Sequence, residues 1–143
     1  MDDLDRKLLA ALAANSSLPT STLARDLGMA RSTVQARIER LERSGIIAGY
    51  TIRLGDVPGH QRIRATVLMQ IEPRATPSVL QRLKPMSEVE SCLTTSGRVD
   101  LILSLSVEST EALDAALDQI GAIPGVKSSE SLIHLSTKFD RRV

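Results

Sequence analysis

Residues 31–43 carry polar and cationic side chains of the kinds that contact DNA. Val34, Ile38 and Leu41 recur at helical spacing and predict an amphipathic helix with one buried stripe. Short polar side chains near the start of such a helix can reach base edges in the major groove, while arginines neutralise phosphates. The segment therefore predicts a DNA-recognition helix. Its candidate DNA-binding residues are Arg31, Ser32, Thr33, Gln35, Ala36, Arg37 and Arg40, with Arg43 as a further candidate for phosphate contact.

The same pattern has a plainer interpretation. An ordinary amphipathic helix would carry solvated arginines, or would pair them with Glu39 and Glu42. The preceding segment favours the DNA interpretation, because it predicts a shorter helix that is capped by Thr20 or Ser21 and ends at Gly28. A helix, a glycine turn and a second helix form the helix-turn-helix pattern.

The composition bounds the class of protein. A chain of 143 residues with 42% hydrophobic and 24% charged residues is typical of a globular protein with one domain or two small ones. Its single cysteine excludes an internal disulfide framework and a clustered-cysteine zinc site. We expect no metal and no cofactor. Because the aromatic residues are one Tyr and one Phe, base stacking on single strands or RNA is nearly excluded, and double-stranded DNA is the expected nucleic acid.

Charge and hydropathy bear on partners and location. The net charge is only +1, so a DNA-binding protein of this balance must concentrate its positive charge locally, and dimerisation would add phosphate contacts. No apolar run approaches the roughly 20 residues that a membrane-spanning helix needs. The opening residues, MDDLDRKLL, contain no apolar signal core. We therefore expect a cytoplasmic protein with no membrane partner.

The recognition segment needs further helices to position it. Residues 2–14 predict a first helix, whose leucines form a buried stripe and whose Asp2, Asp3 and Asp5 suit the positive N-terminal end. Together the segments predict a helix-turn-helix (winged-helix-like) domain over residues 1–49. Alternating apolar residues predict a strand over residues 50–54, which opens a linker of strand and loop over residues 50–61.

From residue 62 the apolar period changes from 3.6 to 2, and a second domain over residues 62–143 is predicted. Its elements follow the order strand, helix, strand, strand, helix, strand, which predicts an α+β, ferredoxin-like βαββαβ fold. Two helices would cover one face of an antiparallel sheet, and the other face would be too apolar for water, so a homodimer is expected. The first strand of this domain is predicted to face inward with Ile63, Ala65, Val67, Met69 and Ile71. The first helix is predicted to be capped by Thr76 ahead of Pro77, with Val79, Leu80 and Leu83 inward, and the second helix to be capped by Ser109. The last strand is predicted over residues 128–139, and the outer face of the sheet is predicted to carry Ile102, Ile133 and Leu135.

These segments resemble the Lrp/AsnC (leucine-responsive, or feast/famine) family of bacterial and archaeal transcription regulators over the whole chain. LDRKLLAAL is similar to the opening helix of the family, and the run R-I-x-R-L-E-x-x-G-I-I-x-G-Y over residues 37–50 is similar to its recognition helix and exit strand. SGRVDLIL resembles its Gly-x-x-Asp turn, and IPGV its Pro-Gly-Val before the last strand. The resemblance implies a sequence-specific DNA-binding regulator that dimerises through its second domain and often forms octamers.

The resemblance also implies a small effector, commonly an amino acid, near the Gly-x-x-Asp turn. Asp100 would pair with its ammonium, and amides of the Gly97 turn would take its carboxylate. The family often has an acidic or polar residue and then an aromatic residue in this turn, where this chain has Arg98 and Val99. In the alternative, Gly97 permits a hairpin and Asp100 is a turn residue. The implied effector-binding residues are Ser96, Gly97, Arg98, Val99 and Asp100, with Ser136 on the last strand as a weaker candidate.

An enzyme is the alternative class of function. Siroheme decarboxylases look similar to this family and use histidine in a tetrapyrrole pocket. The two histidines of this chain, His60 in the linker and His134 on the expected last strand, belong to no catalytic constellation, and paired carboxylates at useful spacing are lacking. We therefore expect no catalytic residues and a regulatory function.

Overall fold

The computed structural model describes residues 1–142 and divides them into two compact units. The first unit contains Met1–Gly55, and the second contains Asp56–Asp140. Among the described residues, no helix is both long enough and apolar enough to cross a membrane. Each unit is described below by itself.

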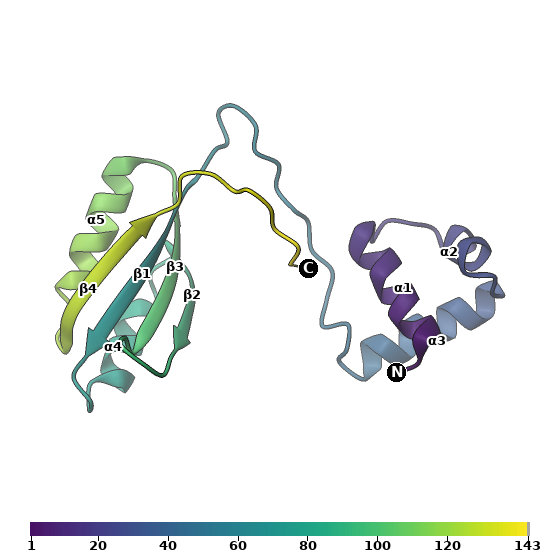
Figure 1. Cartoon of the computed structure of the whole chain (residues 1–143), viewed down its shortest axis with the longest axis horizontal. Coiled ribbons are helices and arrows are strands. Elements are labelled where there is room, and N and C mark those ends of the chain that lie inside the picture. The colour runs from purple at the N-terminus through teal and green to yellow at the C-terminus, as the bar shows by residue number, and fades with distance from the viewer. Residues whose placement is uncertain (143) are drawn as a thin grey trace. The chain divides into compact units, whose positions relative to one another are not determined.

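The first unit consists of three helices (Figure 1), which are α1 (Asp3–Ala14), α2 (Thr20–Leu27) and α3 (Arg31–Arg43). Their bounds confirm the predicted helix-turn-helix. Gly28 ends α2 with φ at +66°, a conformation that glycine adopts without a Cβ clash. The buried hydrophobic residues of this unit are Leu8, Leu12, Leu23, Ala24, Val34 and Leu41.

The two helix starts differ from each other. Asp2 caps α1 in a reciprocal arrangement, because its Oδ1 accepts from the amide of Asp5 at 2.8 Å and its own amide donates to Oδ2 of Asp5 at 3.2 Å. The cap expected from Thr20 or Ser21 at α2 is wrong. Pro19 occupies that position without a side-chain hydrogen bond, since its ring presets the backbone and Thr20 is already helical.

Residues 48–62 contain neither helix nor strand in the structure. The strand predicted over residues 50–54 is therefore wrong, although its apolar alternation is real. A strand needs a hydrogen-bonded neighbour, and here Ile52 and Leu54 are exposed. The hydroxyl of Tyr50 donates instead to Oε1 of Glu42 at 3.2 Å, near the end of α3.

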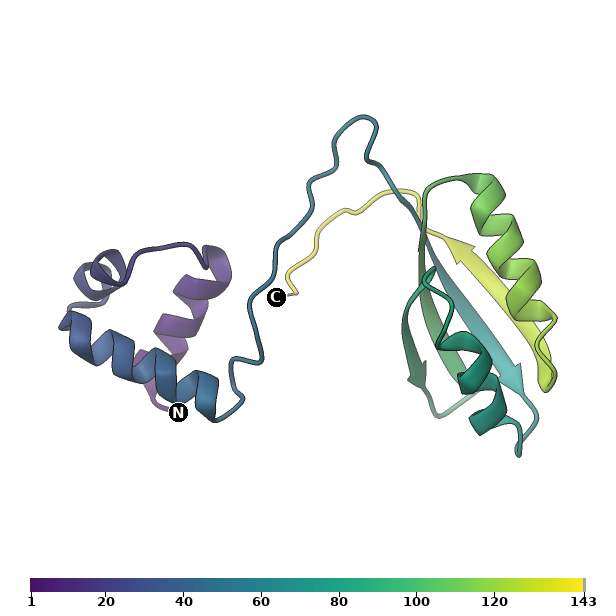
Figure 2. The ribbon, with the colours of Figure 1, turned by 180° about the vertical axis from the view of Figure 1, so that it is seen from behind.

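The second unit has the predicted element order. Neighbouring strands pair antiparallel in the order β2-β3-β1-β4, so β2 and β4 are the edges of the sheet. Figures 1 and 2 show both helices of this unit on the same face of the sheet. The elements are β1 (Ile63–Ile71), α4 (Thr76–Leu83), β2 (Val89–Thr94), β3 (Leu101–Val107), α5 (Thr110–Gly121) and β4 (Val126–Ile133).

Alternation places the core of the second unit between sheet and helices. β1 buries every second residue from Ala65 onward, as predicted, and β3 does the same from Leu101 to Leu105 before Ser106 and Val107 are both buried. Ser109 caps α5 as predicted, since its Oγ accepts from the amide of Ala112 at 3.0 Å. In α4 two expectations are wrong. Ala75 rather than Thr76 is the N-cap residue, and Leu80 is exposed while Val79 and Leu83 are buried.

A glycine just before β4 packs closely against the residue that precedes α4. Gly125 has φ at +99°, and a Cβ placed on it would press against the Cβ of Ala75. Its carbonyl accepts from the amide of Glu72 at 2.7 Å. This position therefore needs glycine both for its backbone conformation and for space.

The last strand and the outer face differ from expectation. β4 ends at Ile133, so His134, Leu135 and Ser136 follow the strand rather than belong to it. Leu132 pairs with Thr66, a residue of the outer side of β1, so Leu132 rather than Ile133 lies on the outer face. The leucines and isoleucine on this helix-free face are Leu68, Leu93, Ile102 and Leu132.

Candidate nucleic-acid interface

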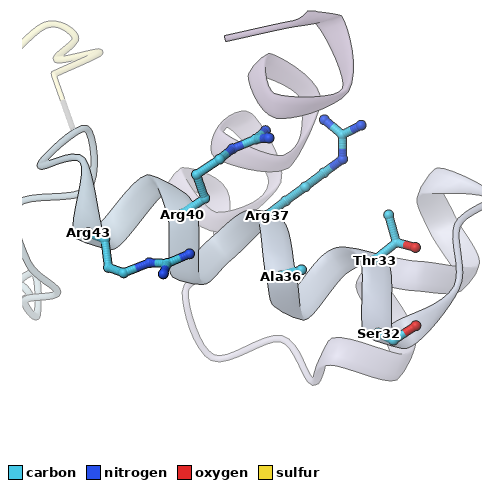
Figure 3. Close-up of a pocket in the computed structure, with 6 residues that line it drawn as sticks. All are labelled: Ser32, Thr33, Ala36, Arg37, Arg40 and Arg43. Carbon is cyan, nitrogen blue, oxygen red and sulfur yellow. The ribbon is translucent and has the colours of Figure 1, made fainter.

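The outward side of α3 borders an open depression on the surface of the first unit (Figure 3). Val34 and Leu41 anchor the opposite side of the helix in the core. Figure 3 shows the small polar residues near the start of α3 and the arginines farther along it. The depression is lined by Ser32, Thr33, Ala36, Arg37, Arg40 and Arg43.

Two of the predicted DNA-binding residues do not line this depression. Arg31 is exposed at the first position of α3. Gln35 is exposed as well, and its amide nitrogen donates to Oε1 of Glu39 at 3.4 Å. Both side chains are therefore on the surface of α3, but outside the depression that the other candidates line.

Arg37 and Arg40 bind carboxylates at the start of α1. Nη1 of Arg37 donates to both carboxylate oxygens of Asp2, at 2.7 and 2.8 Å, and to Oδ1 of Asp5 at 3.0 Å. Nη2 of Arg40 donates to Oδ1 and Oδ2 of Asp5, at 3.2 and 3.0 Å. The partners of these arginines are thus on another helix, and not Glu39 and Glu42 of their own.

Burial ranks the members of this cluster. The Asp5 side chain is 2% exposed, and that of Arg37 is 20% exposed. By contrast, the side chains of Asp2 and Arg40 are 54% and 57% exposed. Asp5 and Arg37 are therefore the inner pair of the cluster, while Asp2 and Arg40 face solvent.

The ion pairs shift the titration of both carboxylates. Hydrogen bonds from Arg37 and from the amide of Asp5 lower the pKa of Asp2 from 3.8 to about 2. Burial raises the pKa of Asp5, but hydrogen bonds from Arg37 and the amide of Asp2 outweigh it and leave the pKa lowered. Hydrogen bonds to the two carboxylates raise the pKa of Arg37. All of these groups are charged at neutral pH.

Sequence reasoning missed the role of Asp2 and Asp5 in this interface. It assigned them only to the positive end of α1. The Asp-x-x-Asp spacing is a signal for a capping box and could have placed both carboxylates at one helix start. Their pairing with Arg37 and Arg40 depends on how α1 and α3 cross, which residue spacing does not report.

In the second unit, the loop between β2 and β3 is anchored to the end of β1. Oδ2 of Asp100 accepts from the amide of Ile71 at 2.9 Å, and the amide of Asp100 donates to the carbonyl of Met69 at 2.8 Å. Gln70 donates from Nε2 to the carbonyl of Arg98 at 2.7 Å. Asp100 therefore has a structural role in this loop, at the place where the pairing of β1 with β4 shifts register.

The other predicted effector residues are arranged around this anchor. Gly97 has φ at +122°, as the turn interpretation expects. Arg98 approaches Oε2 of Glu130 at 3.7 Å in an exposed pair. Ser96 and Val99 belong to the same loop, whereas Ser136 is exposed beyond the end of β4. The loop residues are thus together, and Ser136 follows a different strand.

Comparison with known proteins identifies these two units. Residues 1–42 match the model of the AsnC-type helix-turn-helix domain, and residues 64–143 match that of the Lrp/AsnC ligand binding domain. The chain belongs to the Lrp/AsnC family. Members of this family are transcriptional regulators, and the second unit corresponds to the family's ligand binding domain.

Individual Lrp/AsnC proteins are similar to this chain over nearly its full length. The transcriptional regulator LrpA of Mycobacterium tuberculosis is 32% identical, with 99% of this chain and 95% of LrpA covered. The structure of E. coli AsnC has a TM-score of 0.89 at 26% identity and covers 100% of this chain and 97% of AsnC. A regulator from Neisseria meningitidis, solved in complex with L-methionine, has a TM-score of 0.90 at 23% identity, covers 98% of this chain and 93% of that one, and shows the same fold.

Proposed function

We propose that this Lrp/AsnC regulator reads double-stranded DNA with the side of α3 that borders the depression. The observation that carries the proposal is the gathering of Ser32, Thr33 and Ala36 with arginines on one exposed surface. Ser32, Thr33 and Gln35 supply hydrogen bonds to base edges, and Ala36 allows close approach of the helix. The phosphate contacts come from Arg31, Arg40 and Arg43.

Titrations on two duplexes test this interface. One duplex carries the DNA upstream of the chain's own coding region, and the other has random sequence. Thr33→Ala is expected to weaken binding to the upstream duplex alone by roughly 1–3 kcal/mol, because a base contact is lost. Arg40→Ala is expected to weaken binding to both duplexes. It should also make the slope of log K against log salt shallower by about 0.9 for each helix-turn-helix unit bound to DNA. An unchanged slope for Arg40→Ala and Arg43→Ala alike would place the interface elsewhere.

We also propose that two copies associate through the outer face of the sheet. The helices of the second unit cover only the other face, and Leu68, Leu93, Ile102 and Leu132 form an apolar surface across all four strands. A closed two-fold pair would bury this surface on both copies at once. Higher assemblies, up to the octamer, would then be built from such dimers.

Sedimentation of the full chain tests the dimer. Leu132→Asp places a charge on the outer face and is expected to give monomers at micromolar concentration. Leu80→Asp is the matched control, because Leu80 is an exposed leucine on α4, on the opposite side of the sheet. A monomeric wild-type chain, or equal effects of the two variants, would contradict this assembly.

We further propose an amino-acid effector at the loop formed by Ser96, Gly97, Arg98, Val99 and Asp100, with Ser136 as an additional contact. The match to a ligand binding domain supports a small ligand in this unit. One carboxylate oxygen of Asp100 is bonded to the amide of Ile71, but a carboxylate accepts several hydrogen bonds and can still pair with an ammonium.

Calorimetry with the twenty amino acids, beginning with L-methionine, tests the effector. Asp100→Asn keeps an oxygen for the amide of Ile71 and removes the charge, so the loop is preserved while the ammonium contact is weakened. The expected loss is about one to two decades in affinity, from a charge-assisted contact of roughly 1.5–3 kcal/mol. Equal binding by wild type and variant would remove Asp100 from the site. No binding at millimolar concentration would leave the loop a structural hairpin.

We propose a regulatory rather than a catalytic function, exercised in the cytoplasm, where a regulator meets chromosomal DNA. The tetrapyrrole alternative requires a reactive histidine. Here Nε2 of His134 is 2.7 Å from Oγ1 of Thr66 on the sheet surface. An absorbance titration with a tetrapyrrole is expected to show no spectrum of a protein-bound tetrapyrrole. A shifted Soret band would instead support the enzyme alternative.

A further inference from the structure

Asp2, Asp5, Arg37 and Arg40 form a cluster with two negative and two positive charges, which we call the carboxylate clamp. Arg37 is the most heavily engaged cation of the cluster, with three hydrogen bonds to two carboxylates. Each arginine bonds through a single nitrogen, but Arg40 binds Asp5 alone and its side chain is 57% exposed against 20% for Arg37, so Arg40 remains open to a phosphate. Both arginines border the depression of α3.

The carboxylates of the clamp accept hydrogen bonds from Nη1 of Arg37, and they hold two negative charges beside a guanidinium whose side chain is only 20% exposed. A guanidinium paired in this way is already neutralised, so it adds little to the release of counterions that drives sequence-independent binding. Arg43 also borders the depression, and within residues 1–142 the ion pairs of the clamp carboxylates do not include it. The arginines of α3 are therefore unequal as phosphate ligands.

We propose that the clamp withholds Arg37 from DNA, and that Asp2 thereby sets how many phosphates each helix-turn-helix unit neutralises. Asp2 is the exposed carboxylate of the clamp, while Asp5 is buried beside Arg37. Asp2 is a positioning residue that acts through Arg37 and does not itself touch DNA. It keeps the sequence-independent part of DNA affinity low, so that more of the binding free energy comes from base contacts. This inference rests on the proposed interface on α3.

Asp2→Asn is the direct test. Asparagine is as good a helix cap as aspartate, so α1 keeps its N-terminal hydrogen bond while the charge that pairs with Arg37 is lost. We expect tighter binding to a random-sequence 30-base-pair duplex, by roughly five- to tenfold at 0.1 M salt, and a salt slope steeper by about 0.9 per bound head. Adding Arg37→Gln to this variant should cancel both gains.

Asp3→Asn is the matched control. It makes the same change of charge in the first turn of the same helix, but the Asp3 side chain is 86% exposed and its ion pair is with Arg6, outside the clamp. It is expected to leave the slope unchanged. A wild-type slope for Asp2→Asn would overturn the clamp. Equal steepening by Asp2→Asn and Asp3→Asn would also overturn it, because the effect would then be one of general charge.

Two further variants separate failure of the clamp from failure of the interface. Arg37→Gln alone is expected to leave the salt slope unchanged, whereas Arg43→Gln should lower it by about 0.9 per bound head. If Arg37→Gln lowers the slope as much as Arg43→Gln does, Arg37 binds phosphate in the wild type and the clamp is wrong. If Arg43→Gln has no effect and the wild type does not bind the duplex, the interface on α3 fails instead. Thermal melting monitored by circular dichroism confirms that each variant is folded.

Discussion

Within the described residues, the helical unit buries six hydrophobic side chains, whereas the sheet unit buries fifteen. The helical unit adds the carboxylate clamp, which joins the start of α1 to α3. The sheet unit adds continuous hydrogen-bonded ladders between its strands. A small core thus leaves the orientation of a functional helix dependent on a few polar bonds. A large core fixes its elements by packing.

The largest expected effect separates the stabilities of the two units. Leu8 is fully buried, and Leu8→Ala should cost the helical unit roughly 2–5 kcal/mol, a large share of what so small a unit has. Hydrogen exchange should show faster exchange in α1, α2 and α3 with the sheet unit unaffected. Leu103→Ala is the counterpart in the sheet unit. Equal loss of protection in both units for either variant would mean that they unfold together.

A smaller effect is expected at Gly125, where the sheet unit depends on close packing. Gly125→Ala should lower the stability of this unit by about 1–3 kcal/mol, because the new Cβ meets Ala75 and the backbone has positive φ. Gly59→Ala is the control, since Gly59 also has positive φ but open space around it. Urea denaturation measures both variants, and equal costs would show that crowding at Ala75 contributes nothing.

The smallest expected effect is a loss of stability of the helical unit in acid, which arises from the clamp and is absent at neutral pH. The folded protein lowers the pKa of Asp2 from 3.8 to about 2 and lowers that of Asp5 as well. The stabilisation from Asp2 is therefore complete above about pH 4 and is lost as the pH falls toward 2, and the stabilisation from Asp5 is likewise lost on acidification. Melting of the helical unit across this range should show a weaker pH dependence in Asp2→Asn than in wild type. The same pH dependence in both would mean that the Asp2–Arg37 pair does not stabilise this unit.

The sequence predicts much of the fold because the period of its apolar residues follows the elements. α3 and β1 are identified almost to the residue, since Val34 and Leu41 lie on one helical face and Ala65 to Ile71 alternate in a strand. The strand predicted over residues 50–54 rests on the same kind of apolar period, and this prediction is wrong. Alternation reports which side chains would share a face, but not whether a neighbouring strand exists to pair with.

The candidate site is predicted in its location and not in its pairing. The residue types on α3 indicate which surface faces outward, and the structure places most of the candidates beside one depression. The bonds from Arg37 to Asp2, and from Ile71 to Asp100, join residues far apart in the sequence. Such contacts depend on how elements cross, and local spacing has no information about that.

The order of the strands also bears on aggregation. β2 and β4 present unpaired backbone groups along the edges of the sheet, and an exposed edge can add strands from other molecules without limit. Glu90 lies on β2, and Lys127 and Glu130 lie on β4. Extending the ladder past either edge would bring these charges alongside a new strand and would oppose open-ended fibres. The edge charges thus favour self-association that is finite in copy number.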